Sequence, residues 1–421
     1  MADPVTAEPE EIRAPAIPPD SAGIRDLLRR PDFRRLYLAV VTSELGDAFQ
    51  YIALMWAALV AGGPLGVLVV RLADSVPALV FGFHGGLLAD RSGRRRLMVS
   101  ANLLRAATLV PVAVAGLTGN LPLWALVVAA FLLTTGTSYF DPAYGAALPA
   151  VAGTSGVQAA NALVRASSDA LWLVGSVVAV ALLTVMPVST FFALNAASFL
   201  ISALLLSGLP AFARTRPQDQ APPRIREAFT VLRPHPWLAA AVIALGVAVT
   251  ISSGTWIVGV PQLVRHGLGG GAGSFSILIA AYALGSIAAC AFLARRRVQR
   301  KALGSLLAWC GYLPAYSLLA FAHSLGPALL GALAAGAGQG AAQVLTVSAA
   351  QTEIPDDYLG RVTGLISLVH RGAHATGLLL VSPLFAVLAA RTMFAGAALA
   401  MPLVSLAAIA VAARRAAAAR P

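Results

Sequence analysis

The chain has 421 residues, of which 58% are hydrophobic and only 11% are charged. Soluble domains carry about 25% charged residues, so this composition argues against a water-soluble enzyme and excludes a disordered chain. The net charge of +12 could indicate nucleic-acid binding, but the basic residues stand in short clusters between apolar runs. Such clusters are typical of the loops of a membrane protein. The composition therefore predicts a polytopic helical membrane protein without a nucleic-acid partner.

Twelve apolar runs are long enough to cross a bilayer as helices. Residues 1–35 precede them and are predicted to form a disordered cytoplasmic tail, because they are rich in proline and acids. An N-terminal six-helix bundle at 36–209 has spans near 36–61, 66–89, 97–118, 122–147, 158–185 and 189–209. A polar linker at 210–236 leads to a C-terminal bundle at 237–412, with spans near 237–263, 273–294, 302–322, 326–350, 362–389 and 392–412. A basic tail occupies 413–421.

The basic residues indicate the orientation of these spans. If the N-terminus is cytoplasmic, 24 of the 30 Lys and Arg residues lie in the tails, the linker and the loops on that side. Only Arg265 and Arg391 lie in the loops on the other side. Because cytoplasmic loops are enriched in Lys and Arg, this split predicts an even number of spans with both termini in the cytoplasm.

The two halves of the chain contain an internal repeat. The basic loop at Asp90–Arg96 recurs as Arg295–Lys301, about 205 residues later. The Leu148-Pro149 pair before span five likewise corresponds to Ile354-Pro355 before span eleven. Two six-helix halves related in this way are typical of a transporter built from parallel repeats.

A motif rich in glycine and arginine follows the second span. It reads Gly86-Leu87-Leu88-Ala89-Asp90-Arg91-Ser92-Gly93-Arg94-Arg95-Arg96. This segment matches G-x-L-A-D-R-x-G-R-R at every specified position and resembles the signature of the major facilitator superfamily. The resemblance implies an all-α fold of twelve transmembrane helices in two pseudo-symmetric bundles, which transports small molecules by alternating access.

The motif is expected to act as a gate on the cytoplasmic side. Asp90 would pair with Arg94, or face the positive N-terminal end of span eleven, and Gly93 would permit a tight turn. Asp141, near the inner end of span four, is assigned to the same charge cluster. The alternative is a plain positively charged loop. The predicted gating residues are Gly86, Asp90, Arg91, Gly93, Arg94, Arg95, Asp141, Gly360 and Arg361.

Further segments resemble the branch of the superfamily that includes macrolide-efflux and enterobactin-exporter-like proteins. They are Phe33–Leu36, Leu45–Phe49, Leu103–Ala106, Phe140–Ala143 and Phe191–Leu200. The resemblance implies export across a bacterial cell membrane. Drug antiporters of the superfamily often carry Gly-Pro-x-x-Gly-Gly in span five, where this chain has Gly175–Val180 without the proline and later glycines. Tyr144 stands where an arginine often follows the Asp-Pro-Ala of span four.

Ionisable side chains within the spans are costly, and each is therefore a candidate functional residue. All five acids of this kind lie in the N-terminal half. In span one, Glu44, Asp47 and Tyr51 have the i, i+3, i+7 spacing that places them on one helical face. We expect Glu44 and Asp47 to couple transport to protons or another cation. In the alternative, Asp47 is a structural partner of Arg105 or Arg165.

Three further groups of charged residues lie within spans. Arg71 and Asp74, near the outer end of span two, are expected to form a structural pair or an extracellular gate. Arg165 and Asp169 in span five have the i, i+4 spacing of a local ion pair. A third group lies in span eleven. We expect it either to have a coupling or substrate role or to pack between helices. Its two histidines have no nearby acid or thiol, so they do not predict a zinc site. Its members are His370, Arg371 and His374.

The sequence contains no nucleotide-binding loop or catalytic motif, so neither a cofactor nor an ATPase partner is expected. We expect a monomeric, proton-driven exporter of a drug, macrolide, siderophore or other small amphipathic molecule. Two alternatives stay open at this point. The chain could be an importer or facilitator with structural charges, or a membrane scaffold or sensor that transports nothing.

Overall fold

The computed structural model describes residues 23–91, 93–119, 121–183, 185–211, 225–270 and 272–418. Within these ranges, twelve helical segments are long and apolar enough to cross a membrane, as the sequence predicts. Helices suit this setting because every backbone polar group finds a partner inside its own segment.

The N-terminal half consists of six elements, and the second of them contains two spans. These spans meet at a kink at Gly63, whose φ of 61° and ψ of −155° are open only to glycine. The elements are α1 (Ile24–Arg29), α2 (Pro31–Arg91), α3 (Arg94–Leu117), α4 (Leu123–Ala152), α5 (Val157–Leu182) and α6 (Val188–Ser207).

The C-terminal half begins with the short linker helix α7 (Ile225–Leu232). In its first span, α8 (Pro236–Gly254) continues through a π-helical turn at Thr255–Gly259 into α9 (Val260–Gln262), and a second π-helical turn at Leu263–Gly267 ends the span. The next spans are α10 (Ala272–Arg295) and the pair α11 (Lys301–Cys310) and α12 (Tyr312–Ala320). The last are α13 (Leu325–Glu353), α14 (Asp356–Leu380), with a 3-10 turn at Ser382–Ala386, and α15 (Ala390–Ala418).

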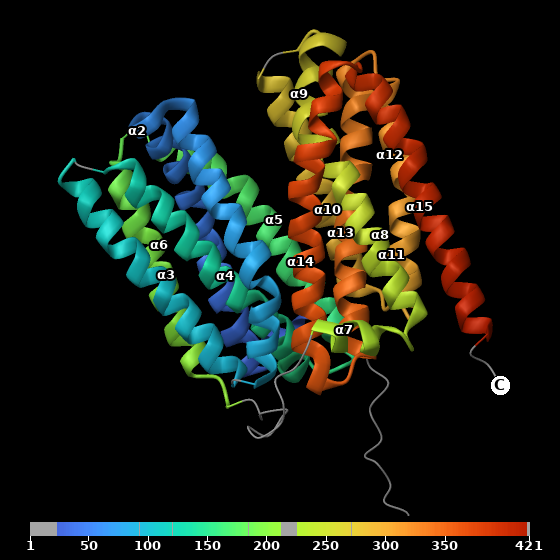
Figure 1. Ribbon diagram of the computed structural model, residues 1–421, viewed down its shortest axis with the longest axis horizontal. Helices are drawn as coiled ribbons and strands as arrows, with labels where there is room; N and C mark the ends of the chain where they lie inside the picture. Colours follow the sequence, from blue (N-terminus) through green and yellow to red (C-terminus); the bar gives the residue numbers. More distant parts are fainter. Residues whose placement is uncertain are drawn as a thin grey trace, which may run out of the picture.

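The two bundles stand side by side and lie closest at the end that carries α7, whereas they diverge toward the opposite end (Figure 1). We call these the linker end and the far end. Contacts between the halves run through α2 and α4 against α14, and through α5 against α10 and α13. Each half also has its own core, and in the C-terminal half Tyr316 packs edge-on to both Tyr312 and Phe394.

The predicted disordered tail is wrong for residues 23–35, which form α1 and the start of α2. Leu27 and Phe33 are fully buried in the N-terminal core, and Arg30 donates a hydrogen bond to the Ala152 carbonyl at 2.7 Å. These two apolar anchors order the segment despite its many charges. Residues 1–22 of the tail, and residues 212–224 of the linker, lie outside the described ranges.

Candidate functional site

The first junction between the halves is formed by α2, α4 and α14 at the linker end. Gly86 of α2 lies so close to α14 that a Cβ atom there would be 2.6 Å from the Gly360 carbonyl oxygen. Gly364 likewise faces the Gly86 backbone, and Gly145 of α4 faces the Thr363 side chain. The glycine that opens the motif therefore permits direct backbone contact between the halves.

Arg94 fixes the same junction from the start of α3. Its buried guanidinium donates hydrogen bonds to the Ala146 carbonyl at 2.8 Å and to the Asp356 carbonyl at 3.1 Å. It also lies 3.8 Å from the Asp356 carboxylate, a partner that the sequence analysis did not identify. Arg95 instead donates to the Leu209 carbonyl at the end of α6. The side chains of Asp90 and Arg91, and all of Ser92, lie outside what the structure describes.

Two other predictions for this motif are resolved by geometry. Gly93 has φ −56°, and a Cβ atom there would meet nothing within 4 Å, so the expected need for glycine in this turn is wrong. Arg361 is fully buried and hydrogen-bonds to Glu227 of α7 and to the Asp357 carbonyl. Arg361 therefore connects α14 to the linker helix.

The second junction is formed by α5, α10 and α13. The buried Gln158 side chain donates to the Leu293 and Arg296 carbonyls at 2.8 and 2.6 Å, and accepts from the Val298 amide at 2.9 Å. One amide side chain thus satisfies three backbone groups where α10 ends. One turn later, Asn161 donates hydrogen bonds to α13, and Gln351 of α13 donates to α4.

Beyond these junctions, a cavity of about 530 Å³ lies between the halves. Its walls come from α2, α4, α5 and α13, and they combine charged and polar groups with aromatic and aliphatic ones. The lining residues are Glu44, Tyr144, Asn161, Val164, Arg165, Ser168, Asp169, Trp172, Gln343, Val344 and Val347. Of the predicted coupling pair, Glu44 lines the cavity and Asp47 does not.

A polar network crosses the cavity region from one half to the other. Arg165 and Asp169 form the expected ion pair, with Nε and Oδ1 3.0 Å apart, and Ser286 of α10 also donates to Asp169. Arg165 donates to the Gln343 amide oxygen, so the amide nitrogen of Gln343 faces His370 Nε2 at 3.2 Å. Because the amide nitrogen of Gln343 can only donate, His370 Nε2 accepts this hydrogen bond, as one ring nitrogen of a neutral imidazole can.

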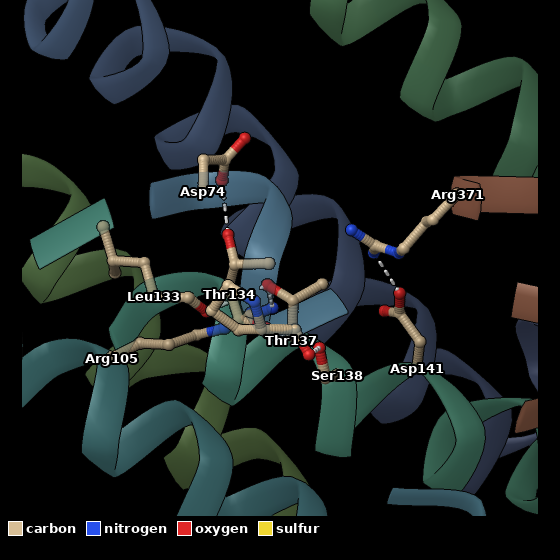
Figure 2. Close-up of polar contacts among 9 residues, drawn as sticks. Asp74, Arg105, Leu133, Thr134, Thr137, Ser138, Asp141 and Arg371 are labelled. Atoms are coloured by element: carbon tan, nitrogen blue, oxygen red, sulfur yellow. Dashed lines mark hydrogen bonds and ion pairs between the residues drawn. The ribbon is translucent and has the colours of Figure 1, made fainter. Parts of the chain in front are cut away.

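Asp141 lies at the level of this polar network, which we call the middle region, because its partner Arg371 is next to His370. Its assignment to the linker-end charge cluster is therefore wrong. It pairs with Arg371 across the halves at 2.6 Å. Figure 2 shows Thr134, Thr137 and Asp141 along α4, with Arg371 facing Asp141. Their partners come from three other helices, namely Asp74 of α2, Arg105 of α3 and Arg371 of α14.

Asp47 and Arg105 lie inside the N-terminal half and do not form a salt bridge. Asn195 of α6 donates to Asp47 Oδ1 at 3.1 Å and to Gln50 at 2.7 Å. The buried Arg105 guanidinium donates to Thr137 and lies over the ring of Phe199, 5.0 Å from its centroid. The hydrogen-bond partner of Asp47 is therefore the Asn195 amide, and Arg105, its partner in the alternative interpretation, forms no salt bridge with it.

The outer pair of span two is present. Arg71 Nη1 lies 3.2 Å from Asp74 Oδ2 and stacks over Tyr51, whose ring meets Trp172 edge-on at 5.4 Å. His374 contributes its backbone carbonyl to a contact with Ser253. Among the described residues, no group of three or more His, Cys, Asp and Glu side chains could hold a metal ion.

Sequence reasoning missed the amides that connect helices. Gln158, Asn161 and Asn195 were not singled out, although each is a buried polar side chain within or at the start of an apolar run. Each could have been found by the cost of leaving an amide without hydrogen bonds in a span. Their partners are on helices distant in the chain, so the sequence does not identify them.

The chain is similar in sequence to a known protein family and to several of its relatives. Residues 26–420 match the family described as transmembrane secretion effector. The uncharacterized MFS-type transporter YfiS of Bacillus subtilis is 25% identical over 362 residues, which cover 80% of this chain and 84% of YfiS. Macrolide efflux protein A of Enterococcus faecalis is 32% identical over 83 residues, covering 20% of this chain and 26% of that protein.

A solved structure has the same fold. The E. coli fucose:proton symporter FucP, a major facilitator superfamily transporter, has been crystallised in the outward conformation. That structure superposes with a TM-score of 0.71 at 15% identity, covering 91% of this chain and 98% of FucP.

Proposed function

The chain belongs to the transmembrane secretion effector family of major facilitator superfamily transporters, and from this we propose that it is a proton-coupled exporter of a small amphipathic molecule. The central cavity is the observation that carries the proposal. Trp172, Val344 and Val347 offer apolar contact in the same space where Glu44 and Arg165 offer charge. An amphipathic molecule matches such mixed walls, since binding sites combine apolar lining with a few placed polar groups.

Glu44 is the proton carrier in this proposal. Arg165, a cation that lines the same cavity, is already paired with Asp169, and no cation among the described residues forms a salt bridge with Glu44. A carboxylate that lines the cavity without a fixed counter-ion can bind and release a proton as substrate enters and leaves. Acidic side chains within membrane spans often mark the proton pathways of pumps and transporters.

In the proposed orientation, the linker end faces the cytoplasm of a bacterial cell. Arginines are concentrated there, at α1, at the start of α3 and at the end of α10. Because both junctions hold the linker end together, the structure then corresponds to an outward-open state. The outward conformation of FucP, which shares the fold, supports this assignment. The macrolide efflux relative supports export as the direction of transport.

The test is transport by purified protein in proteoliposomes with an imposed pH gradient and a panel of fluorescent dyes and macrolides. Glu44→Gln keeps the shape of the side chain and removes its titration. We expect gradient-driven transport to fall by about tenfold or more, as for loss of an essential general acid–base group. Substrate binding without a gradient should persist.

Asp32→Asn is the matched control, because Asp32 is an exposed carboxylate at the linker end that pairs only with Arg35. It should transport as the wild type does. Undiminished pH-driven transport by Glu44→Gln would reject the coupling role of Glu44. Accumulation of substrate in the lumen that corresponds to the cytoplasm would identify an importer. If no gradient moves any ligand, the chain is not a transporter of these molecules.

Asp47→Asn separates the two acids of span one. Asp47 accepts a hydrogen bond from Asn195 inside the N-terminal half. Its loss is therefore expected to affect the packing of α2 against α6 and not the binding of a proton or substrate in the cavity. If Asp47→Asn abolishes coupling while Glu44→Gln does not, the proton carrier is Asp47.

A further inference from the structure

A second cavity, of about 780 Å³, opens at the linker end between α1, the start of α5 and the end of α10. We call it the arginine pocket. Five arginines and one acid contribute to its walls. These are Arg25, Asp26 and Arg29 on α1, and Arg295, Arg296 and Arg297 at the end of α10. None of the five has a salt bridge with a carboxylate among the described residues, and all five are exposed.

The single acid of the pocket does not neutralise these charges. Asp26 Oδ2 accepts a hydrogen bond from the Gly23 amide at the start of its own helix, at 3.3 Å. Both walls thus contribute positive charge to one common space. Guanidinium groups bind phosphate in planar, paired hydrogen bonds, and several together are typical of phosphate recognition.

Gln158 removes an obstacle to anion binding at this place. The C-terminal end of a helix such as α10 carries a partial negative charge on its free carbonyls, which would repel an anion. Here the Gln158 amide donates to the Leu293 and Arg296 carbonyls. Ile24 of α1 and Leu293 of α10 both line the pocket, and Ile24 packs against the buried apolar cluster that contains Leu293, so the pocket also has an apolar base that belongs to both halves.

We propose that the arginine pocket binds a phosphate-bearing anion, either the headgroup of an anionic phospholipid or a free phosphate compound. The bound phosphate would bridge α1 and α5 of one half to α10 of the other. If the chain alternates as proposed above, the anion stabilises the state in which the linker end is closed. The binding itself does not depend on the transport proposal.

The experiment measures unfolding temperature and native mass spectra of the full-length protein in three conditions. The first is phosphatidylglycerol, the second is phosphatidylcholine, and the third is phosphatidylcholine with glycerol phosphate. The pocket variant is Arg295→Gln/Arg296→Gln/Arg297→Gln. The control is Arg300→Gln/Arg414→Gln/Arg415→Gln, which removes equal charge at the linker end outside the pocket. A second variant, Arg25→Gln/Arg29→Gln, tests the other wall should the first fail to fold.

We expect stabilisation of wild type and control by phosphatidylglycerol but not by phosphatidylcholine, and about tenfold weaker binding by the pocket variants. Stabilisation by glycerol phosphate alone would identify a soluble ligand at the same site. Equal loss of binding in pocket and control variants would show attraction to charge alone and overturn the proposal, as would no binding by the wild type. Because no transport is measured, a failed transport assay leaves this result intact.

Discussion

At the first junction α2 and α14 meet through glycines, whereas at the second junction α5 meets α10 and α13 through amide side chains. Gly86 and Gly360 bring two backbones into contact, and Gln158 and Asn161 instead fill a wider space with hydrogen bonds. The internal repeat relates these two places, since span two corresponds to span eight and span five to span eleven. Two equivalent positions thus close by different physical means.

The difference indicates how each junction responds to change. Backbone contact is limited by sterics, so a single added atom disturbs it, and it does not depend on any one side chain. The amide junction tolerates small movements but leaves buried carbonyls and an amide unsatisfied once Gln158 is lost. Unsatisfied buried groups cost about 1–3 kcal/mol each.

The largest effect is expected for Gly86→Ala at the first junction. The new Cβ would lie 2.6 Å from a backbone oxygen that cannot rotate away, whereas ordinary contact begins at 3.4 Å. Overpacking costs about 1–3 kcal/mol, or roughly a 5- to 150-fold shift away from the closed linker end. Gly93→Ala is the control, because its Cβ meets nothing within 4 Å. Equal crosslinking across the linker end in both variants would show that the glycine contact is not limiting.

A somewhat smaller effect is expected for Gln158→Ala at the second junction. The Leu293 and Arg296 carbonyls and the Val298 amide lose their partner, but water from the arginine pocket can reach them. Because water can replace the lost partner, we expect the closed state to lose about 0.5–1.5 kcal/mol, the net contribution of a typical hydrogen bond. Hydrogen exchange at the end of α10 measures this loss. The exposed Gln299→Ala should leave exchange unchanged, and an effect as large as that of Gln158→Ala would contradict the account.

The smallest effect is expected for the Asp141–Arg371 pair, which lies in the middle region beside the first junction. Both side chains are 36% exposed, so screening by water limits the pair to about 0.2–1 kcal/mol. Asp141→Asn should slow transport only a few-fold, and the exchange Asp141→Arg/Arg371→Asp should restore part of the rate. If the double exchange is no better than either single change, the pair is not acting through its charge.

The sequence predicted the twelve spans because each carries its own signal in an apolar run of sufficient length. It also predicted the Arg71–Asp74 and Arg165–Asp169 pairs, whose partners lie within four residues. Asp141 and Arg371 are 230 residues apart. The sequence around each of them does not indicate which residue of the other helix lies at the same depth in the bundle. The ordered segment at 23–35 was missed for a related reason, since Leu27 and Phe33 are isolated among charges and are anchored only by the folded bundle.

Both junctions are expected to open together when the transporter exposes its cavity to the linker end. Distances between pairs of spin labels test this expectation. One pair, at Thr154 and Gln299, spans the second junction, and another, at Arg96 and Asp357, spans the first. All four sites are exposed. A third pair at Thr118 and Leu388, two exposed sites on opposite halves, reports on the far end. On acidification with substrate, we expect both linker-end distances to lengthen together while the far-end distance shortens. Lengthening of one linker-end distance alone, or of neither while transport proceeds, would contradict it.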